Sequence, residues 1–368
     1  DTETTGLAGG TGTFAFQVGV GWVEEEGFRV LQFFMRDYDE EPGQMAMIGE
    51  LFSKASMLVT YNGGTFDLPL LRTRFVFNRV RVPLMDIPHL DLLPVARRLW
   101  KTQHGRANLS FLEEKILEDV REGDVPGSLI PSLYFQFTRG ASPRTMVPVF
   151  YHNRMDIVAL AALTEKALTC HREPESIENE WERLGVARFH EKRGREQVAS
   201  QILAPLRRTE IDPDCWHLAA RTQALLCKKL GDLDRALDLW WEVFHHGPFD
   251  PLVYIELAKH LEHKSKDLDE AKQVVFTVFE KYGIEPDPET DEGESLFGDD
   301  LELDSGPKYD YSEGVRGWRD DLPSRYVDED PDQVGTPKNV FSPPRLTTRF
   351  QKELNRRYAR LVRKQRTS

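Results

Sequence analysis

The sequence has few cysteines and no long apolar run. Its three cysteines, Cys170, Cys215 and Cys227, are an odd number, and their spacing is not typical of a metal site. This pattern excludes a disulfide-stapled secreted domain and makes a reducing cytoplasm the expected compartment. No stretch approaches the roughly 20 apolar residues that a membrane-spanning helix requires, so no membrane partner is expected.

An initiator methionine is also missing. The sequence begins on Asp1 with no apolar residues ahead of it, although a central strand would be expected to lead into such a carboxylate. We therefore expect the first strand to be truncated. For the same reason, the lack of a signal peptide carries little weight.

Basic residues are scarce in one part of the chain. The protein has 48 Lys and Arg against 61 Asp and Glu, a net charge of −13. Residues 283–335 alone contain 4 basic and 18 acidic residues, whereas residues 336–368 contain 10 basic and 1 acidic. The acidic stretch is rich in Pro and Gly and poor in branched apolar residues, which predicts disorder. The net charge therefore does not argue against a nucleic-acid substrate.

Strands and helices alternate over the first part of the chain. Two strands are predicted at 13–23 and 28–34, joined by an acidic turn, and a buried strand at 57–61. Helices are predicted at 45–55, at 68–77 and from 150 to 168. In the last, alanine and leucine dominate from 157 to 168 and no glycine or proline intervenes. This order predicts an α/β fold built on a mixed sheet.

Acidic residues lie at the ends of several of these elements. Asp1 and Glu3 would lie on the same side of an extended segment, and like charges so close favour a divalent cation between them. Asp67 follows a buried strand and the turn at 62–65, and it opens the next helix. His152 and Asp156 lie one helical turn apart, although such a pair alone is more often structural.

Three motifs combine these residues in a fixed order. Asp1–Leu7, Tyr61–Asp67 and His152–Asp156 resemble the signature of the DEDD 3′→5′ exonucleases, a branch of the ribonuclease-H-like superfamily. The stretches 89–93, 96–100 and 123–131 are similar to the YprB-type branch of bacteria. The likeness spans roughly residues 1–170. It implies a ribonuclease-H-like mixed sheet flanked by helices, in a domain of residues 1–172.

The resemblance also implies an activity, the hydrolysis of phosphodiester bonds in DNA or RNA from the 3′ end. The alternative from a different class is a catalytically weak scaffold. In the nuclease, two Mg²⁺ or Mn²⁺ ions activate the attacking water and stabilise the leaving 3′-oxygen. The expected ligands of the ions are Asp1, Glu3, Asp67 and Asp156.

Contacts to nucleic acid are implied for the first two motifs. In related exonucleases, the loop after the first strand clasps the last nucleotide. The expected residues are Thr4, Thr5, Gly6, Leu7, Asn62 and Phe66. For residues 4–7, an ordinary exit from a strand is an equal alternative. Asp91, by contrast, is expected to cap a helix rather than to bind metal.

The third motif departs from both known spacings of that superfamily. One subgroup has a tyrosine four residues before the last aspartate, and the other has a histidine five before it. Here the two residue types are exchanged, with Tyr151 five and His152 four residues before Asp156. Helix geometry favours His152 as the general base, since residues four apart share a face. Tyr151 is the alternative.

The second half of the chain is predicted to be helical and repetitive. Residues 231–237 recur at 266–272, a spacing of 35, and Ala199 lies 37 residues before Ala236. This period is similar to that of tetratricopeptide repeats, so residues 177–283 are predicted to form a tetratricopeptide-like domain that binds a protein partner. The alternative is an irregular helical domain with no partner.

Two segments are predicted beyond this domain. Residues 284–343 are expected to be an acidic disordered linker, and residues 344–366 a basic amphipathic helix. The helix carries Phe350, Leu354, Tyr358 and Leu361 at helical spacing. Its expected docking site is a partner, nucleic acid or the acidic segment itself.

Overall fold

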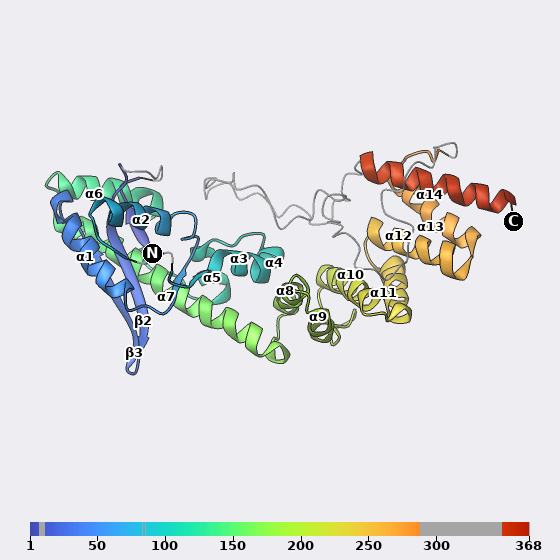
Figure 1. The fold of residues 1–368 in the computed structure, drawn as a ribbon, viewed down its shortest axis with the longest axis horizontal. Coiled ribbons are helices and arrows are strands. Elements are labelled where there is room, and N and C mark those ends of the chain that lie inside the picture. The colour runs from blue at the N-terminus through green and yellow to red at the C-terminus, as the bar shows by residue number, and fades with distance from the viewer. Residues whose placement is uncertain (7–11, 83, 85, 288–347, 368) are drawn as a thin grey trace. The chain divides into compact units, whose positions relative to one another are not determined.

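The chain falls into two units, Asp1–Ile177 and Glu178–Ser368 (Figure 1). The computed structural model describes residues 1–6, 12–82, 84, 86–287 and 348–367. The first unit combines strands and helices, which confirms the α/β class, and the described part of the second is helical. Most of the predicted acidic linker, from 288 to 343, lies outside the described residues.

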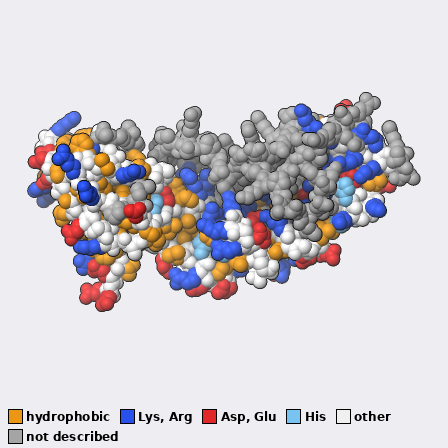
Figure 2. Space-filling model, viewed as in Figure 1, with side chains coloured by type: hydrophobic (Ala, Val, Ile, Leu, Met, Phe, Trp, Pro, Cys, Tyr) orange, Lys and Arg blue, Asp and Glu red, His pale blue; other side chains and the backbone are white. Residues whose placement is uncertain are grey.

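The first unit is built on an antiparallel sheet. Strands β1 (Thr2–Thr4), β2 (Ala15–Glu24) and β3 (Gly27–Phe34) lie in the order β1-β2-β3. The tip of the β2–β3 hairpin carries Glu24, Glu25 and Glu26, and it is the red tip at the lower left of Figure 2. Strands β4 (Leu58–Thr60) and β5 (His89–Asp91) form a separate parallel pair. All predicted strands are therefore present.

Helices pack on this sheet through two apolar clusters. Helices α1 (Glu41–Phe52) and α2 (Asp67–Phe77) bury Met45, Ile48 and Leu71 against β2 and β3. Helices α6 (Ile130–Thr138) and α7 (Val147–Arg172) enclose a second cluster, in which Tyr134 stacks on Phe16. The remaining helices of this unit are α3 (Leu92–Ala96), which continues through a π-helical turn (Arg97–Lys101) into α4 (Thr102–His104), and α5 (Leu109–Ile116).

Gly19 of β2 is the point where α7 meets the sheet. A Cβ atom at this position would lie 2.2 Å from Asn153 Oδ1 and 2.3 Å from Ile157 Cδ1, so the close approach of α7 requires glycine. The backbone of Gly19 also pairs with Asp1, since its N–H donates to the Asp1 carbonyl at 2.9 Å. Gly19 therefore brings the first and the third motif together.

Replacing Gly19 with alanine is expected to destabilise the protein by about 1–3 kcal/mol, the usual cost of overpacking a core. Urea unfolding measures this change. The matched control is Gly43→Ala in α1, where an added Cβ meets nothing within 4 Å, so stability should be unchanged or slightly higher. Equal stability of the two variants would contradict the close contact between α7 and β2.

The second unit begins with six helices joined by short turns. They are α8 (Glu180–Glu191), α9 (Glu196–Leu203), α10 (Pro213–Lys229), α11 (Leu233–His246), α12 (Pro251–His260), which continues through a π-helical turn (Leu261–Ser265), and α13 (Leu268–Tyr282). Asp232 and Asp267, the aspartates of the sequence repeat, occupy equivalent N-cap positions of α11 and α13. Ala236 and Ala271 are fully buried one turn later. The repeat therefore marks equivalent helix starts.

The last helix, α14 (Thr348–Thr367), packs on this same unit. Leu354 and Leu361 join its apolar core, and Tyr358 packs edge-on against Phe279 of α13. Glu262, whose side chain is fully buried, pairs with Arg357 at 2.9 Å and with Lys364 at 2.8 Å. This helix occupies most of the segment 344–366 that was predicted to be a basic amphipathic helix. Within this unit, the buried carboxylate of Glu262 attracts the basic face of α14, and the predicted docking on a partner, on nucleic acid or on the acidic segment stays a prediction.

Cys170, Cys215 and Cys227 are buried thiols. Among the described residues, no helix combines the length and the apolar character that crossing a membrane would require.

Candidate active site

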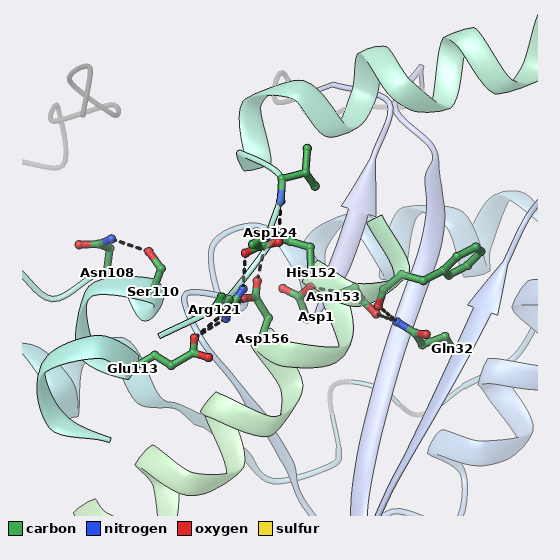
Figure 3. A network of polar contacts seen from close by, with 12 residues as sticks. Asp1, Gln32, Asn108, Ser110, Glu113, Arg121, Asp124, His152, Asn153 and Asp156 are labelled. Carbon is green, nitrogen blue, oxygen red and sulfur yellow. Dashed lines mark hydrogen bonds and ion pairs between the residues drawn. The ribbon is translucent and has the colours of Figure 1, made fainter. Parts of the chain in front are cut away.

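The three sequence motifs converge around β1. Glu3 lies in β1, Asp67 is the first residue of α2, and Asp156 lies on α7 (Figure 3 shows Asp1 beside this part of α7). Two hydrogen bonds tie the elements together. The Thr2 hydroxyl donates to Asp67 Oδ1 at 2.5 Å, and Asn153 Nδ2 donates to Asp1 Oδ2 at 2.8 Å.

Glu3 is the most perturbed of these carboxyl groups. Burial raises the pKa of Glu3 from 4.5 to about 7, and the negative charges of Asp156 and Asp67 add to the rise, while His152 opposes it. Two neighbouring acids thus disfavour ionisation of a carboxyl group whose burial already disfavours the charged form. A divalent cation among them would cancel this repulsion, and oxygen ligands of this kind suit Mg²⁺ or Mn²⁺.

The pKa of Glu3 predicts a pH dependence of stability. Between pH 4.5 and about 7 the folded protein keeps a proton that the unfolded chain releases, so the free energy of unfolding falls as the pH rises through this window. The loss is on the order of 3 kcal/mol. Glu3→Gln should abolish it, whereas Glu25→Gln, at an exposed glutamate, should not. Urea unfolding of both variants at several pH values tests this, and an unchanged profile in Glu3→Gln would contradict the perturbed pKa.

Three of the four predicted ligands have a protein donor. Asp1 accepts from Asn153, Asp67 from Thr2, and Asp156 from Arg121. Over the residues that the structure describes, no three His, Cys, Asp or Glu side chains already stand in a metal-binding arrangement. The chemistry of the donor set still fits hard cations, because Asp1, Glu3, Asp67 and Asp156 all supply carboxylate oxygens. Binding would replace the contact of Arg121 with Asp156 by a contact to an ion.

Asn153 is a residue that sequence reasoning missed. It is fully buried, and Gln32 of β3 donates to its Oδ1 at 2.9 Å. This bond fixes the orientation of the amide, so that Nδ2 points at Asp1 (Figure 3). The available signal was helical spacing, since Asn153 lies three residues before Asp156 and shares its face.

His152 lies beside Asp156, as helix geometry predicts. Its Nε2 is 3.5 Å from Asp156 Oδ2, and its Nδ1 is 2.9 Å from Asp124 Oδ1. Tyr151 carries the guanidinium of Arg154 over its ring, 5.5 Å from the centroid. The structure thus brings the preferred base to the acidic cluster.

Arg121 lies in the segment between α5 and α6, and its side chain contacts three acidic residues. Its guanidinium contacts Asp156 Oδ1 at 2.5 Å, Asp124 Oδ2 at 3.0 Å and Glu113 Oε2 at 2.8 Å (Figure 3). Sequence reasoning assigned no role to Arg121 or Glu113. Asp124 belongs to the stretch 123–131, which was noted only for its family likeness.

The predicted nucleotide-contact residues of the first motif take part in local structure. The Thr4 hydroxyl donates to the Gly6 carbonyl at 3.0 Å, and the Thr5 hydroxyl accepts from the Phe14 N–H at 3.0 Å. Gly6 has open space where a side chain would be. Leu7 lies outside the described residues.

The second motif forms the turn between β4 and α2. Asn62 is exposed in a left-handed conformation, φ 63°, and Phe66 is the N-cap residue of α2. Asp91 accepts from the N–H groups of Asn62 and Gly64 in this turn, at 2.8 and 3.1 Å, and it also caps α3. The preference for a structural role of Asp91 was therefore right.

Comparison with known proteins identifies the family. Residues 1–168 match the RNase H superfamily. Over 286 residues, 74% of this chain and 67% of the relative, the sequence is 35% identical to a Bacillus subtilis (strain 168) protein described as uncharacterized protein YprB. The chain belongs to the YprB family. No solved structure matches.

These matches confirm the predicted resemblance to the YprB-type branch and the ribonuclease-H-like fold of the first unit. The superfamily supports a nuclease-type activity on nucleic acid, and its nucleases generally use divalent metals. The tetratricopeptide-like nature of the second unit stays a prediction.

Proposed function

We propose that this protein is a 3′→5′ exonuclease that uses two divalent metal ions. One observation carries the proposal: three motifs, at residues 1–7, 61–67 and 152–156, converge, so that the carboxylates of Asp67 and Asp156 act on Glu3. Membership of the RNase H superfamily supports the same chemistry.

Each residue of the site would have a separate role. Asp1, Glu3, Asp67 and Asp156 would hold two Mg²⁺ or Mn²⁺ ions, which when bound supply the positive charge that activates water and stabilises a leaving oxygen. His152 Nε2 would accept the proton of the attacking water. Asn153 would keep Asp1 oriented while its carboxylate binds.

The substrate would approach over the β4–α2 turn. Asn62 is exposed there, and Phe66 immediately precedes Asp67, so both would contact the terminal nucleotide together with Thr4, Thr5 and Gly6. The far tip of the β2–β3 hairpin is unsuited to this task, because Glu24, Glu25 and Glu26 would repel phosphates (Figure 2).

The decisive experiment is a nuclease assay on DNA and RNA of equal sequence, labelled at the 5′ end. The expected result with Mn²⁺ or Mg²⁺ is a ladder of products that shorten from the 3′ end, and none with a chelator. Products that arise only from internal cleavage would contradict the exonuclease, and the absence of any metal-dependent cleavage would contradict the nuclease.

A scaffold without catalysis is the second candidate. The pairing of Asp156 with Arg121 favours it, because this contact ties up a required carboxylate. In that case the function would be protein binding, and the stacked helices of the second unit would bind a segment of the partner. Nucleic-acid binding with no cleavage under either metal would support the scaffold. In both cases we place the protein in the cytoplasm, where its three buried thiols would stay reduced.

A further inference from the structure

Asp124 contacts the ring of His152 with both carboxylate oxygens. Its Oδ1 and Oδ2 lie 2.9 and 3.0 Å from Nδ1 of the histidine. An ionised carboxylate has no proton to donate, so Nδ1 must carry the hydrogen of this bond. In the neutral ring, Nε2 then has a free lone pair, and Nε2 is the nitrogen that faces Asp156.

We propose that Asp124 is a positioning residue, which sets the tautomer and the orientation of His152 so that Nε2 can accept a proton. The contact between Nε2 and Asp156 Oδ2 supports this assignment. Its length of 3.5 Å exceeds that of an ordinary hydrogen bond, as expected for two acceptors without a proton between them. The inference rests on the proposed function, in which His152 is the base.

A buried ion pair holds Asp124 in place. Arg121 donates to Asp124 Oδ2 at 3.0 Å and is itself anchored by Glu113 at 2.8 Å. Side-chain exposure is only 7% for Arg121 and 2% for Glu113. Water therefore competes poorly for these contacts, and the ion pair of Arg121 with Asp124 holds its geometry better than an exposed pair would.

The same contacts argue against Asp124 as a further metal ligand. Its Oδ1 accepts from the N–H of Val125 at 2.8 Å as well as from His152. Its Oδ2 accepts from Arg121 and from His152. Both oxygens are thus engaged by donors, whereas ligation would require at least one free lone pair.

The first test reads the tautomer directly and needs no activity. Two-dimensional NMR of ¹⁵N-labelled, metal-free protein at mildly alkaline pH distinguishes Nδ1–H from Nε2–H in neutral imidazole. We expect Nδ1–H for His152 in the wild type and a shift toward Nε2–H in Asp124→Ala. Asp119→Ala, at an exposed aspartate of the same segment, should leave the spectrum of His152 unchanged. A wild-type ring with hydrogen on Nε2, or on both nitrogens, overturns the proposal.

The second test is a double-mutant cycle on the nuclease rate. Asp124→Ala should lower kcat by about 10–100-fold, the usual worth of a residue that orients a functional group, with KM for nucleic acid little changed. In the His152→Ala background, the same substitution should have no further effect on kcat, because the residue through which it acts is gone.

The outcomes of the two tests are separable. An additional loss of kcat in the double variant would show that Asp124 acts independently of His152 and would overturn the positioning role. Asp124→Glu, which can restore the contact, should recover part of the rate if the role is correct. A wild type with no nuclease activity would refute the proposed function. The NMR measurement would still decide whether Asp124 determines the tautomer of His152.

Discussion

Asp67→Asn is expected to remove nuclease activity by more than about 100-fold, because even partners of metal ligands are worth about 10–100-fold. The substitution keeps the shape of the side chain, and the amide oxygen can still accept from the Thr2 hydroxyl that contacts Asp67 Oδ1. It removes one negative charge beside Glu3, so the metal-free fold should be as stable as the wild type or more so.

Thermal unfolding with and without Mn²⁺ supplies a reading that is independent of activity. A ligand at 100 times its Kd stabilises the folded state by about 2.7 kcal/mol, so the wild type should gain stability with Mn²⁺ and Asp67→Asn should gain little. Asp119→Asn, at an exposed aspartate, is the matched control and should behave like the wild type. Full activity in Asp67→Asn would rule out this site. All variants should share one N-terminus, because the ammonium of Asp1 lies near Glu3.

The elements of the first unit could be predicted because their signals are local. Alanine and leucine, which dominate from 157 to 168 without glycine or proline, predicted the helix at 150–168, and α7 spans Val147–Arg172. An acidic turn with glycine between two apolar runs predicted the β2–β3 hairpin. The motifs then identified the superfamily, which no count of strands and helices would have done.

The contacts between the motifs could not be predicted in the same way. Gln32 and Asn153 are 121 positions apart, and Arg121 and Asp156 are 35 apart. Such pairs depend on how closely two elements pack, and here the missing side chain of Gly19 sets that distance. The four carboxylates were recognisable from their motifs, but the residues that orient them were not.

The C-terminal helix shows the same limit. Its amphipathic pattern was clear, but the partner was sought among nucleic acid, other proteins and the acidic segment. In the structure, Arg357 and Lys364 of this helix pair with Glu262, a buried carboxylate of the same unit. Within one sequence, a charge that will be buried looks no different from a charge that will be solvated, so the docking site follows only from the packing of α13 and α14.

The final expected result concerns the base. His152→Ala should lower the rate of hydrolysis by about 10²–10⁴-fold, the usual worth of general base catalysis, while Tyr151→Phe should cost much less. The structure supports this ranking, since His152 Nε2 faces Asp156 at 3.5 Å. The fold should survive His152→Ala, because Asp124 keeps Arg121 and the N–H of Val125 as donors.

Single-turnover rates at saturating Mn²⁺ distinguish a slower hydrolysis step from weaker metal binding. Both variants should keep the stabilisation that Mn²⁺ confers on the wild type, because neither removes a carboxylate. If Tyr151→Phe lost more rate than His152→Ala, the tyrosine would be the base, and α7 would have to turn by about 100°, the angle per residue of a helix. If both kept the wild-type rate, hydrolysis would proceed without a side-chain base, and the hydrogen bond between Asp124 and His152 would serve only to hold α7 against the segment that carries Arg121.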